Sequence, residues 1–396
     1  MIRTFILSLF CFPCLVANAV AFSFDSCVRA VRQNVVPDKR VAIFEPSVKS
    51  VGMNKIAVCG RTSSSAAKDS LLSYLSTAGY VVIDSMDVWP FRNVGERCFG
   101  VVSHSVIAMN AKPDFSAEMT TQALLGTPVR ILEEKDGWLR IQTPDDYIAW
   151  ATAGSVTRMN KAAINRWNNA PKVIYTALAG TVFSTPDQTG HVVSDVVAGN
   201  MFRLLGEKGN CYEIGYPDGR SGFVSKQEAV RVEEWLSEIK ITGESFVEKA
   251  KQLMGLPYLW GGASPKGVDC SGLIKVVTFL HGIIVQRDAS QQAYTGYPVN
   301  DFSFDCQMLD AGDLLFFGVP ANSGQKERIV HVGMYIGNQQ YIHSQTYVHI
   351  SSFNPEDSNF DEYNKKRFIR AVKILPALNT KGITTIKTNQ LYQQQP

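Results

Sequence analysis

The hydrophobic pattern is clearest in the last third of the chain, where apolar residues recur at helical spacing behind a short polar stretch. These apolar residues are Leu273, Val276, Val277 and Leu280. The polar stretch before them is Asp269-Cys270-Ser271, in which either Asp269 or Ser271 is a suitable N-cap. We therefore expect a helix with Cys270 in or beside its first turn. Unpaired N–H groups and the positive end of the helix dipole favour a thiolate at that place.

Short apolar stretches follow this helix and are typical of strands. They span residues 313–318, 330–337, 340–344 and 368–374, and Gly337-Asn338 is a hairpin turn signal between the second and the third. One helix followed by antiparallel strands predicts an α+β domain over residues 231–375. The charged segment 233–254 has a helical pattern and leads into this domain.

Residues 99–230 repeat themselves at an offset of 73 residues without a gap. Matching positions include Pro113 and Pro186, Gly126 and Gly199, and Trp150 and Phe223. Each copy has short alternating strands, a polar turn and a closing aromatic residue, which is the pattern of a small β-barrel. We expect one barrel at 99–156 and a linker with a second barrel at 157–230. The copies differ at polar positions, because Glu118 corresponds to His191 and Tyr147 to Arg220.

The two ends of the chain have different patterns from the middle. Residues 1–21 carry Arg3, an apolar stretch and small residues that fit a cleavable secretory signal. Residues 22–98 predict a small α/β module, with strands at 41–44, 56–59 and 80–83 and a helix at 66–75. Gly79 is a suitable C′ residue for that helix. We expect the polar tail at 376–396 to be frayed.

Composition narrows the possible partners. The 396 residues are 45% hydrophobic and 19% charged, which is typical of a globular protein with two to four domains. A formal net charge of +3 argues against a nucleic-acid partner. No apolar run is long enough to span a bilayer, so we expect an exported, periplasmic or secreted protein without a membrane anchor. We separately expect a monomer. A Cys59–Cys98 disulfide is conceivable, although most cysteines are expected to be buried free thiols.

Cys270 and two histidines provide candidate chemistry. His331 begins the sequence His-Val-Gly-Met-Tyr-Ile-Gly, and His343 follows the hairpin turn. A cysteine nucleophile, a histidine base and a residue that orients the base form a papain-type constellation. The same three residue types are also zinc ligands, so a metal site is the alternative interpretation. The remaining histidines have no such context.

These segments resemble the NlpC-type papain-like cysteine peptidases, and all the family's motifs occur in the family's order. The motifs are Pro257-Tyr258-Leu-Trp260-Gly-Gly, Asp269-Cys270-Ser271-Gly-Leu273, Arg287-Asp288-Ala-Ser290-Gln-Gln, Gly312-Asp313-Leu-Leu-Phe-Phe, His331-Val-Gly-Met-Tyr-Ile-Gly and His343-Ser. The two repeats resemble bacterial SH3-like domains. With these modules, the chain is most similar to the γ-D-glutamyl-L-diamino acid endopeptidases, also called dipeptidyl-peptidase VI.

The resemblance implies roles for individual residues. Cys270 would be the nucleophile, His331 the base and His343 the orienting residue, with the Tyr258 hydroxyl beside the oxyanion. Asp269 and Ser271, with Glu118 and Tyr147 from the first barrel, would hold a free α-amino group. Trp260, Asp288 and Ser290 would lie near the substrate.

We therefore expect a peptidase that needs no cofactor and cleaves the γ-D-glutamyl bond to a diamino acid in murein peptides with a free N-terminal L-Ala. A carboxylate pair such as Glu118 and Asp269 accounts for the free amine, because it would bury the ammonium against charge-assisted hydrogen bonds. Three alternatives remain: an endopeptidase that acts on intact crosslinked wall, a non-catalytic wall-binding protein, and an amidase or acyltransferase on the same fold.

Overall fold

The computed structural model describes residues 23–300 and 302–393, which form two compact units. The first unit contains the described residues up to Lys39 together with Ile43–Val88. The second contains Arg40–Ala42 and the chain from Trp89 onward. The predicted secretory signal at 1–21, with Cys11 and Cys14, lies outside the described residues.

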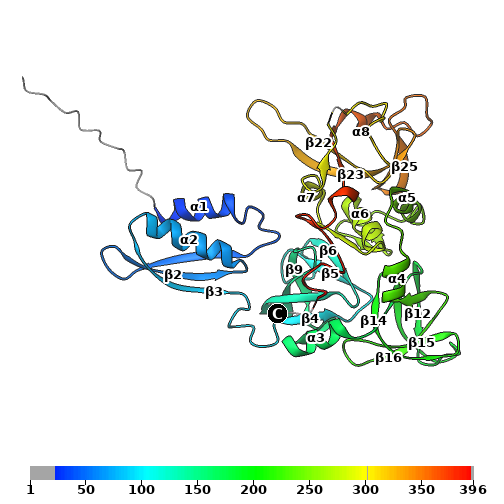
Figure 1. Cartoon of the computed structure of the whole chain (residues 1–396), viewed down its shortest axis with the longest axis horizontal. Helices are drawn as coiled ribbons and strands as arrows, with labels where there is room; N and C mark the ends of the chain where they lie inside the picture. Colours follow the sequence, from blue (N-terminus) through cyan, green and yellow to red (C-terminus); the bar gives the residue numbers. More distant parts are fainter. Residues whose placement is uncertain (1–22, 301, 394–396) are drawn as a thin grey trace, which may run out of the picture. The chain divides into compact units, whose positions relative to one another are not determined.

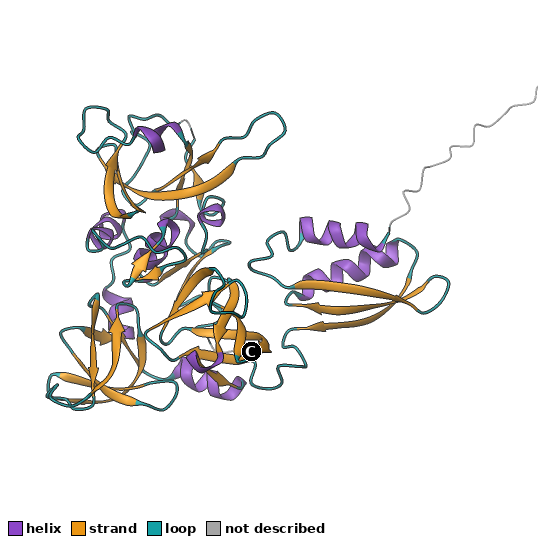
Figure 2. Cartoon of the chain, turned by 180° about the vertical axis from the view of Figure 1, so that it is seen from behind, coloured by secondary structure: helices purple, strands orange, loops and turns teal. Residues whose placement is uncertain are grey.

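The first unit is a small α/β module in which two helices cover one face of a three-stranded sheet (Figures 1 and 2). Its elements are α1 (Phe24–Asn34), β1 (Phe44–Ser50), β2 (Lys55–Thr62), α2 (Ser65–Thr77) and β3 (Val81–Val88). Gly79 follows α2 with φ of +90°, as its position after the helix predicts. The strand predicted at 41–44 is wrong, because Arg40–Ala42 belong to the other unit and β1 begins at Phe44.

Two seven-stranded barrels begin the second unit. The first contains β4 (Phe99–Val102), β5 (Val106–Asn110), β6 (Met119–Leu124), β7 (Pro128–Lys135), β8 (Trp138–Gln142), β9 (Ile148–Thr152) and β10 (Val156–Met159). The second contains β11 (Lys172–Tyr175), β12 (Ala179–Phe183), β13 (Val192–Val197), β14 (Met201–Lys208), β15 (Cys211–Gly215), β16 (Ser221–Ser225) and β17 (Ala229–Arg231). Corresponding strands start 73 residues apart, and the strand order is the same in both sheets. Helix α3 (Lys161–Asn169) connects the barrels.

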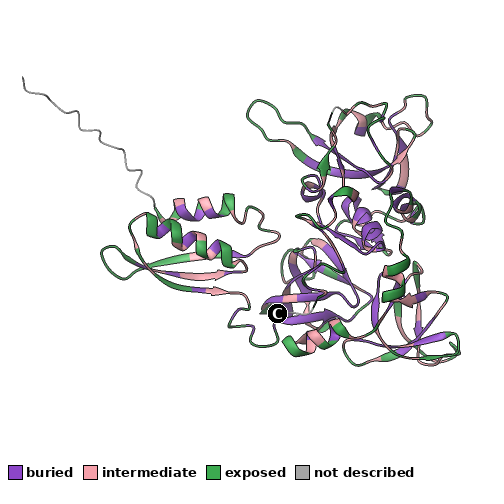
Figure 3. Ribbon diagram, viewed as in Figure 1, coloured by how far each residue is buried: buried purple, intermediate pink, exposed green. Residues whose placement is uncertain are grey.

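The last part of the chain packs helices against a six-stranded sheet of order β21-β26-β22-β23-β24-β25. The strands are β21 (Tyr297–Pro298), β22 (Leu314–Val319), β23 (Arg328–Gly337), β24 (Gln340–Gln345), β25 (Tyr347–Ser352) and β26 (Phe368–Lys373). The expected charged helix is two helices, α4 (Val232–Glu238) and α5 (Gly243–Lys251). Helix α6 (Cys270–Phe279) is buried along most of its length (Figure 3), and α7 (Ala289–Gln292) follows it.

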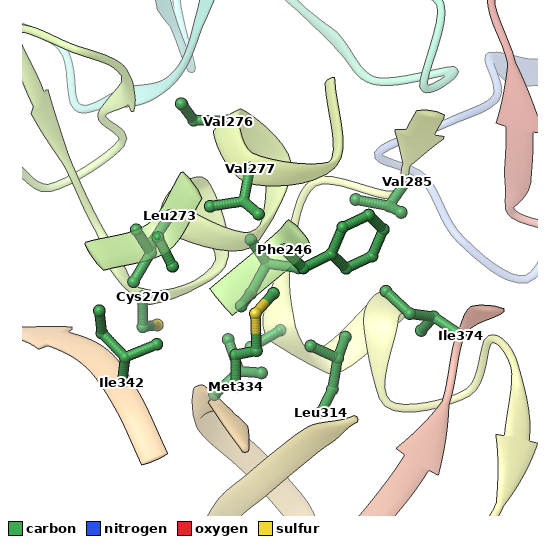
Figure 4. Close-up of a cluster of buried hydrophobic side chains, with 14 of the residues drawn as sticks. Phe246, Cys270, Leu273, Val276, Val277, Val285, Leu314, Met334, Ile342 and Ile374 are labelled. Carbon is green, nitrogen blue, oxygen red and sulfur yellow. The ribbon is translucent and has the colours of Figure 1, made fainter. Parts of the chain in front are cut away.

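An apolar core joins α6 to this sheet. Leu273 and Val277 from the helix meet Met334 and Ile342 from β23 and β24. Figure 4 shows Cys270 at the edge of this core, with its sulfur directed toward the strands. The helix and hairpin that sequence periodicity predicted are therefore packed face to face.

The tail expected to be frayed is ordered up to residue 393, so that prediction is wrong. Strand β27 (Ile383–Thr385) pairs antiparallel with β20 (Ile283–Val285). Ile383 and Leu391 are buried, and the Asn389 side chain donates to the Pro144 carbonyl in the first barrel at 2.8 Å. Scattered apolar residues in a polar segment are thus sufficient to anchor it.

The six described cysteines are all free thiols, so the conceivable Cys59–Cys98 disulfide is absent from the described structure. Five of them are buried, as expected, while Cys59 is half-buried. None of the helices in the described part of the chain is both long and apolar enough to cross a membrane.

Candidate active site

Cys270 is the first residue of α6, and Asp269 is its N-cap. The Asp269 Oδ1 atom accepts from the Gly272 N–H at 2.7 Å, as an N-cap does. Its Oδ2 accepts from the Gly261 N–H at 3.1 Å. Both hydrogen bonds fix the turn that presents Cys270, which is 7% exposed.

Arg287 is the buried counterion of this cap, with a side chain that is 1% exposed. Its Nη1 and Nη2 atoms donate to the two oxygens of Asp269 at 3.1 and 2.6 Å, and Nη1 also donates to Ser271 Oγ at 2.9 Å. Its Nε donates to Thr121 Oγ1 on β6 at 2.8 Å. Arg287 therefore connects the start of α6 to the first barrel.

The two histidines lie on neighbouring strands and are bonded to each other. His331 Nε2 is 2.7 Å from His343 Nδ1, and His343 Nε2 is 3.0 Å from Ser351 Oγ. Tyr341 lies within hydrogen-bonding reach of Ser351 and donates to Asp361 Oδ2 at 2.8 Å. We call His331, His343, Ser351, Tyr341 and Asp361 the imidazole relay.

If Nδ1 of His331 is to accept a proton, the hydrogen bonds of the relay determine the tautomers of both histidines. His331 then carries its hydrogen on Nε2 and donates to His343 Nδ1. His343 in turn carries its hydrogen on Nε2 and donates to Ser351. In this arrangement each imidazole N–H meets an acceptor, and Nδ1 of His331 carries no hydrogen.

The strand that carries His331 lies against Cys270. The N–H of Val332, the residue after His331, is close enough to the Cys270 sulfur to lower its pKa. Burial nevertheless raises that pKa to about 12, and Asp269 adds to the rise. Burial also lowers the pKa of His331 to about 4. At neutral pH the resting groups are therefore a neutral thiol and a neutral imidazole.

The helix start does favour the thiolate, as expected, but it does not decide the resting state. The N–H groups of Val332 and Ser271 and the Arg287 guanidinium do favour the charged form, but burial outweighs them. A nucleophile here requires His331 to take the proton as the sulfur attacks, rather than a thiolate formed in advance.

A cleft of about 340 Å³ opens beside Cys270. One wall comes from the first barrel, through Glu118, Thr120 and Tyr147. The loop at 260–264 is docked on β6 of that barrel, where Gln122 Oε1 accepts from the Ala263 N–H at 2.9 Å. Gly261 has φ of +75°, and a Cβ there would lie 2.3 Å from the Met119 carbonyl oxygen. Only glycine permits this close approach.

The residues expected to bind substrate are brought together in this cleft. Tyr258, Trp260, Asp269, Ser271, Asp288 and Ser290 line it along with Glu118 and Tyr147. Trp260 Nε1 donates to Glu118 Oε1 at 2.8 Å, across the junction between the first barrel and the last part of the chain. Tyr147 is buried, and its hydroxyl lies 3.4 Å from Asp288 Oδ2. Burial raises the pKa of the Tyr258 hydroxyl, which therefore stays protonated.

The three cleft carboxylates differ in how they are compensated. Asp269 is paired with Arg287, and Asp288 is paired with Arg40 at 2.8 Å. Glu118 is exposed and accepts from the neutral Trp260 side chain. Of these three carboxylates, Glu118 is therefore the one that we expect to bind a cation from solvent most strongly.

In the second barrel, the residues at the equivalent positions make different contacts. Arg220, which corresponds to Tyr147, donates from Nη2 to the Ser103 carbonyl of the first barrel at 2.7 Å. Its guanidinium also stacks on Tyr216. His191, which corresponds to Glu118, is exposed. Among the described residues that line the cleft, none comes from the second barrel.

Sequence reasoning assigned no role to Arg40 or to the outer residues of the relay. Arg287 stood in a recognised motif, but its role as counterion needed the fold. The alternative of a metal site is not supported, because the described residues contain no group of three His, Cys, Asp or Glu side chains able to hold an ion. The facing nitrogens of His331 and His343 are instead hydrogen-bonded.

Known proteins match the chain in two separate ranges. Residues 255–373 match the NlpC/P60 family, and residues 109–155 match the bacterial dipeptidyl-peptidase SH3 domain. A γ-D-glutamyl-L-lysine dipeptidyl-peptidase of Bacillus cereus is 29% identical over 57% of this chain and 67% of its own length. Dipeptidyl-peptidase 6 of Lysinibacillus sphaericus is 29% identical over 60% of this chain and 86% of its own.

The fold also has a counterpart among solved structures. A Bacillus cereus protein of the NlpC/P60 family superposes with a TM-score of 0.59, at 22% identity, over 70% of this chain and all of its own length. The predicted combination of a papain-like domain with SH3-like barrels in an α+β fold is thereby confirmed.

Proposed function

From the premise that this chain carries an NlpC/P60 cysteine peptidase domain behind a bacterial dipeptidyl-peptidase SH3 domain, we propose that it hydrolyses the bond between γ-D-glutamate and a diamino acid in cell-wall peptides. The observation that carries the proposal is the placement of Cys270 at the start of α6, against the strand that presents His331. The name of the Bacillus cereus relative gives the same bond, with lysine as the diamino acid.

In the proposed reaction, the Cys270 sulfur attacks the γ-carbonyl carbon while Nδ1 of His331 takes the thiol proton. The tetrahedral intermediate collapses with cleavage of the C–N bond, and His331 returns the proton to the leaving amine. Water then attacks the thioester with His331 as the base. The products are L-Ala-γ-D-Glu and a peptide that begins with the diamino acid.

Two groups beside the cleft are candidates to hold the oxyanion. The Cys270 N–H has no partner within the helix, because the first four N–H groups of a helix are left over. The Tyr258 hydroxyl lines the same cleft and stays protonated. Two such donors aimed at the developing charge are the usual requirement for acyl transfer.

The wall formed by the first barrel supports a preference for a free N-terminal amine. Glu118 lines that wall, and an ammonium group placed beside it would form charge-assisted hydrogen bonds. An acylated amine would bring no charge, so it could not form a charge-assisted hydrogen bond with Glu118. The substrates would accordingly be released stem peptides rather than intact wall, in the compartment to which a secretory signal delivers the chain.

The test is digestion of L-Ala-γ-D-Glu-L-Lys and its diaminopimelate counterpart, each with and without an N-acetyl group, followed by mass spectrometry. We expect L-Ala-γ-D-Glu from the free-amine peptides, much slower cleavage of the acetylated ones, and no cleavage by Cys270→Ala. Cys59→Ala is the matched control and should keep full activity. Cleavage by Cys270→Ala would overturn the proposed chemistry, and equal cleavage of acetylated peptides would overturn the free-amine requirement.

A further inference from the structure

Arg40 is a cation in the cleft that comes from outside both matched ranges of the chain. Its Nη1 atom donates to Asp288 Oδ2 at 2.8 Å and to Ser290 Oγ at 2.9 Å. These two partners lie at the start of α7, 248 and 250 residues further along the chain. A short segment before the first barrel thus contributes a charged side chain to the site.

The backbone around Arg40 is fixed to the first barrel. The Arg40 carbonyl accepts from the Ile148 N–H at 2.7 Å, and the Val41 carbonyl accepts from Gln142 Nε2 at 2.9 Å. Ile148 directly follows Tyr147, whose hydroxyl also lies near Asp288. Arg40 is therefore held on the same rigid wall that supplies Glu118 and Tyr147.

The charges that line the cleft indicate which kind of ligand Arg40 would bind. The charged residues that line the cleft are Glu118, Asp269, Asp288 and Arg40, so Arg40 is the one cation among the described lining residues. Its side chain is 34% exposed, whereas Arg287 is buried behind Asp269. Asp269 and Asp288 are each paired with an arginine, so Glu118 is the lining carboxylate that would repel an entering anionic group most, and Arg40 is the lining side chain that would attract it.

The proposed substrate contains such an anion. When glutamate is linked through its γ-carboxyl group, its α-carboxylate remains free and charged, one residue away from the ammonium of L-Ala. A substrate with both charges matches a cleft that has an exposed carboxylate in Glu118 and a half-buried guanidinium in Arg40.

Building on the proposed function, we propose that Arg40 is a specificity-determining residue that recognises the α-carboxylate of the γ-linked D-glutamyl group. Arginine is suited to the role because its planar guanidinium matches a carboxylate. Asp288 and Ser290 orient the guanidinium. The enzyme accordingly distinguishes stem peptides that carry a free α-carboxylate from stems in which this group is a carboxamide.

The experiment compares L-Ala-γ-D-Glu-L-Lys with the same peptide whose D-glutamyl α-carboxylate is a carboxamide. Wild-type enzyme should cleave the carboxylate peptide with a kcat/KM about tenfold or more above that of the carboxamide, which is the range for a hydrogen bond to a charged group. Arg40→Gln should lose this preference by slowing only the carboxylate peptide, and Arg40→Lys should restore part of it. Arg231→Gln is the control, because Arg231 also forms an exposed ion pair but lies in the second barrel.

The outcomes separate this inference from the proposed function. Equal wild-type cleavage of the two peptides would overturn the role of Arg40 and leave the peptidase assignment intact. An equal loss on both peptides in Arg40→Gln would also overturn it, since Arg40 would then only support Asp288. If wild-type enzyme cleaved neither peptide, the proposed function itself would fail.

Discussion

Replacing Arg287 by Met should destabilise the protein more than any exposed ion pair can. Arg287 makes four hydrogen bonds of 2.6 to 3.1 Å to Asp269, Ser271 and Thr121. Its loss leaves the Asp269 carboxylate, whose side chain is 12% exposed, without its counterion. Breaking a buried pair in this way costs about 3–5 kcal/mol of the free energy of unfolding. That is a large part of the roughly 5–15 kcal/mol that stabilises a typical protein.

The assay is equilibrium urea denaturation of the full chain, followed by circular dichroism. Lys366→Met is the matched control, because the Lys366–Glu362 pair is exposed and should contribute little to the free energy of unfolding. In the double variant Arg287→Met with Asp269→Asn, no uncompensated charge remains, so the loss should be smaller than the sum of the single losses. If Arg287→Met lost no more stability than Lys366→Met, the buried pair would not be the structural clamp inferred for the site.

Two further predictions concern the catalytic groups. Glu118→Gln should raise KM for free-amine peptides by about tenfold or more, by loss of a charge-assisted hydrogen bond, and initial rates across substrate concentration measure it. An unchanged KM would contradict the ammonium site. Asp361→Asn keeps the N-cap of α8 (Glu362–Lys366) but removes a negative charge that raises the pKa of His331. Burial, Arg367 and His349 lower that pKa and remain in the variant. The acidic limb of the kcat/KM profile should therefore move to lower pH, whereas an unmoved limb would show that Asp361 acts only as a cap.

The sequence allowed prediction of the elements that depend on local pattern. The 73-residue offset predicted two barrels, and the two sheets have the same strand order. The N-cap before Cys270 and the turn at Gly337-Asn338 were predicted from neighbouring residues. The candidate residues of the cleft were brought together as the family resemblance implied, although the structure leaves their individual roles as predictions.

What sequence reasoning missed depends on long-range contacts and on burial. No local signal connects Arg40 to Asp288 across 248 residues, and the outer relay from Ser351 to Asp361 is visible only once three strands are paired. The pKa of Cys270 follows from how completely the fold buries the thiol, which a helix-start argument does not include. The ordering of the tail likewise needed a partner strand at 283–285.

The central claim is that Cys270 attacks the γ-carbonyl carbon and carries the acyl group. The most direct measurement is rapid mixing of the enzyme with L-Ala-γ-D-Glu-L-Lys, acid quench, and mass spectrometry of the proteolysed protein. The account predicts the L-Ala-γ-D-Glu acyl group on the fragment that contains Cys270, formed before the dipeptide is released. An acyl group on another residue, or product formation by Cys270→Ala, would contradict it.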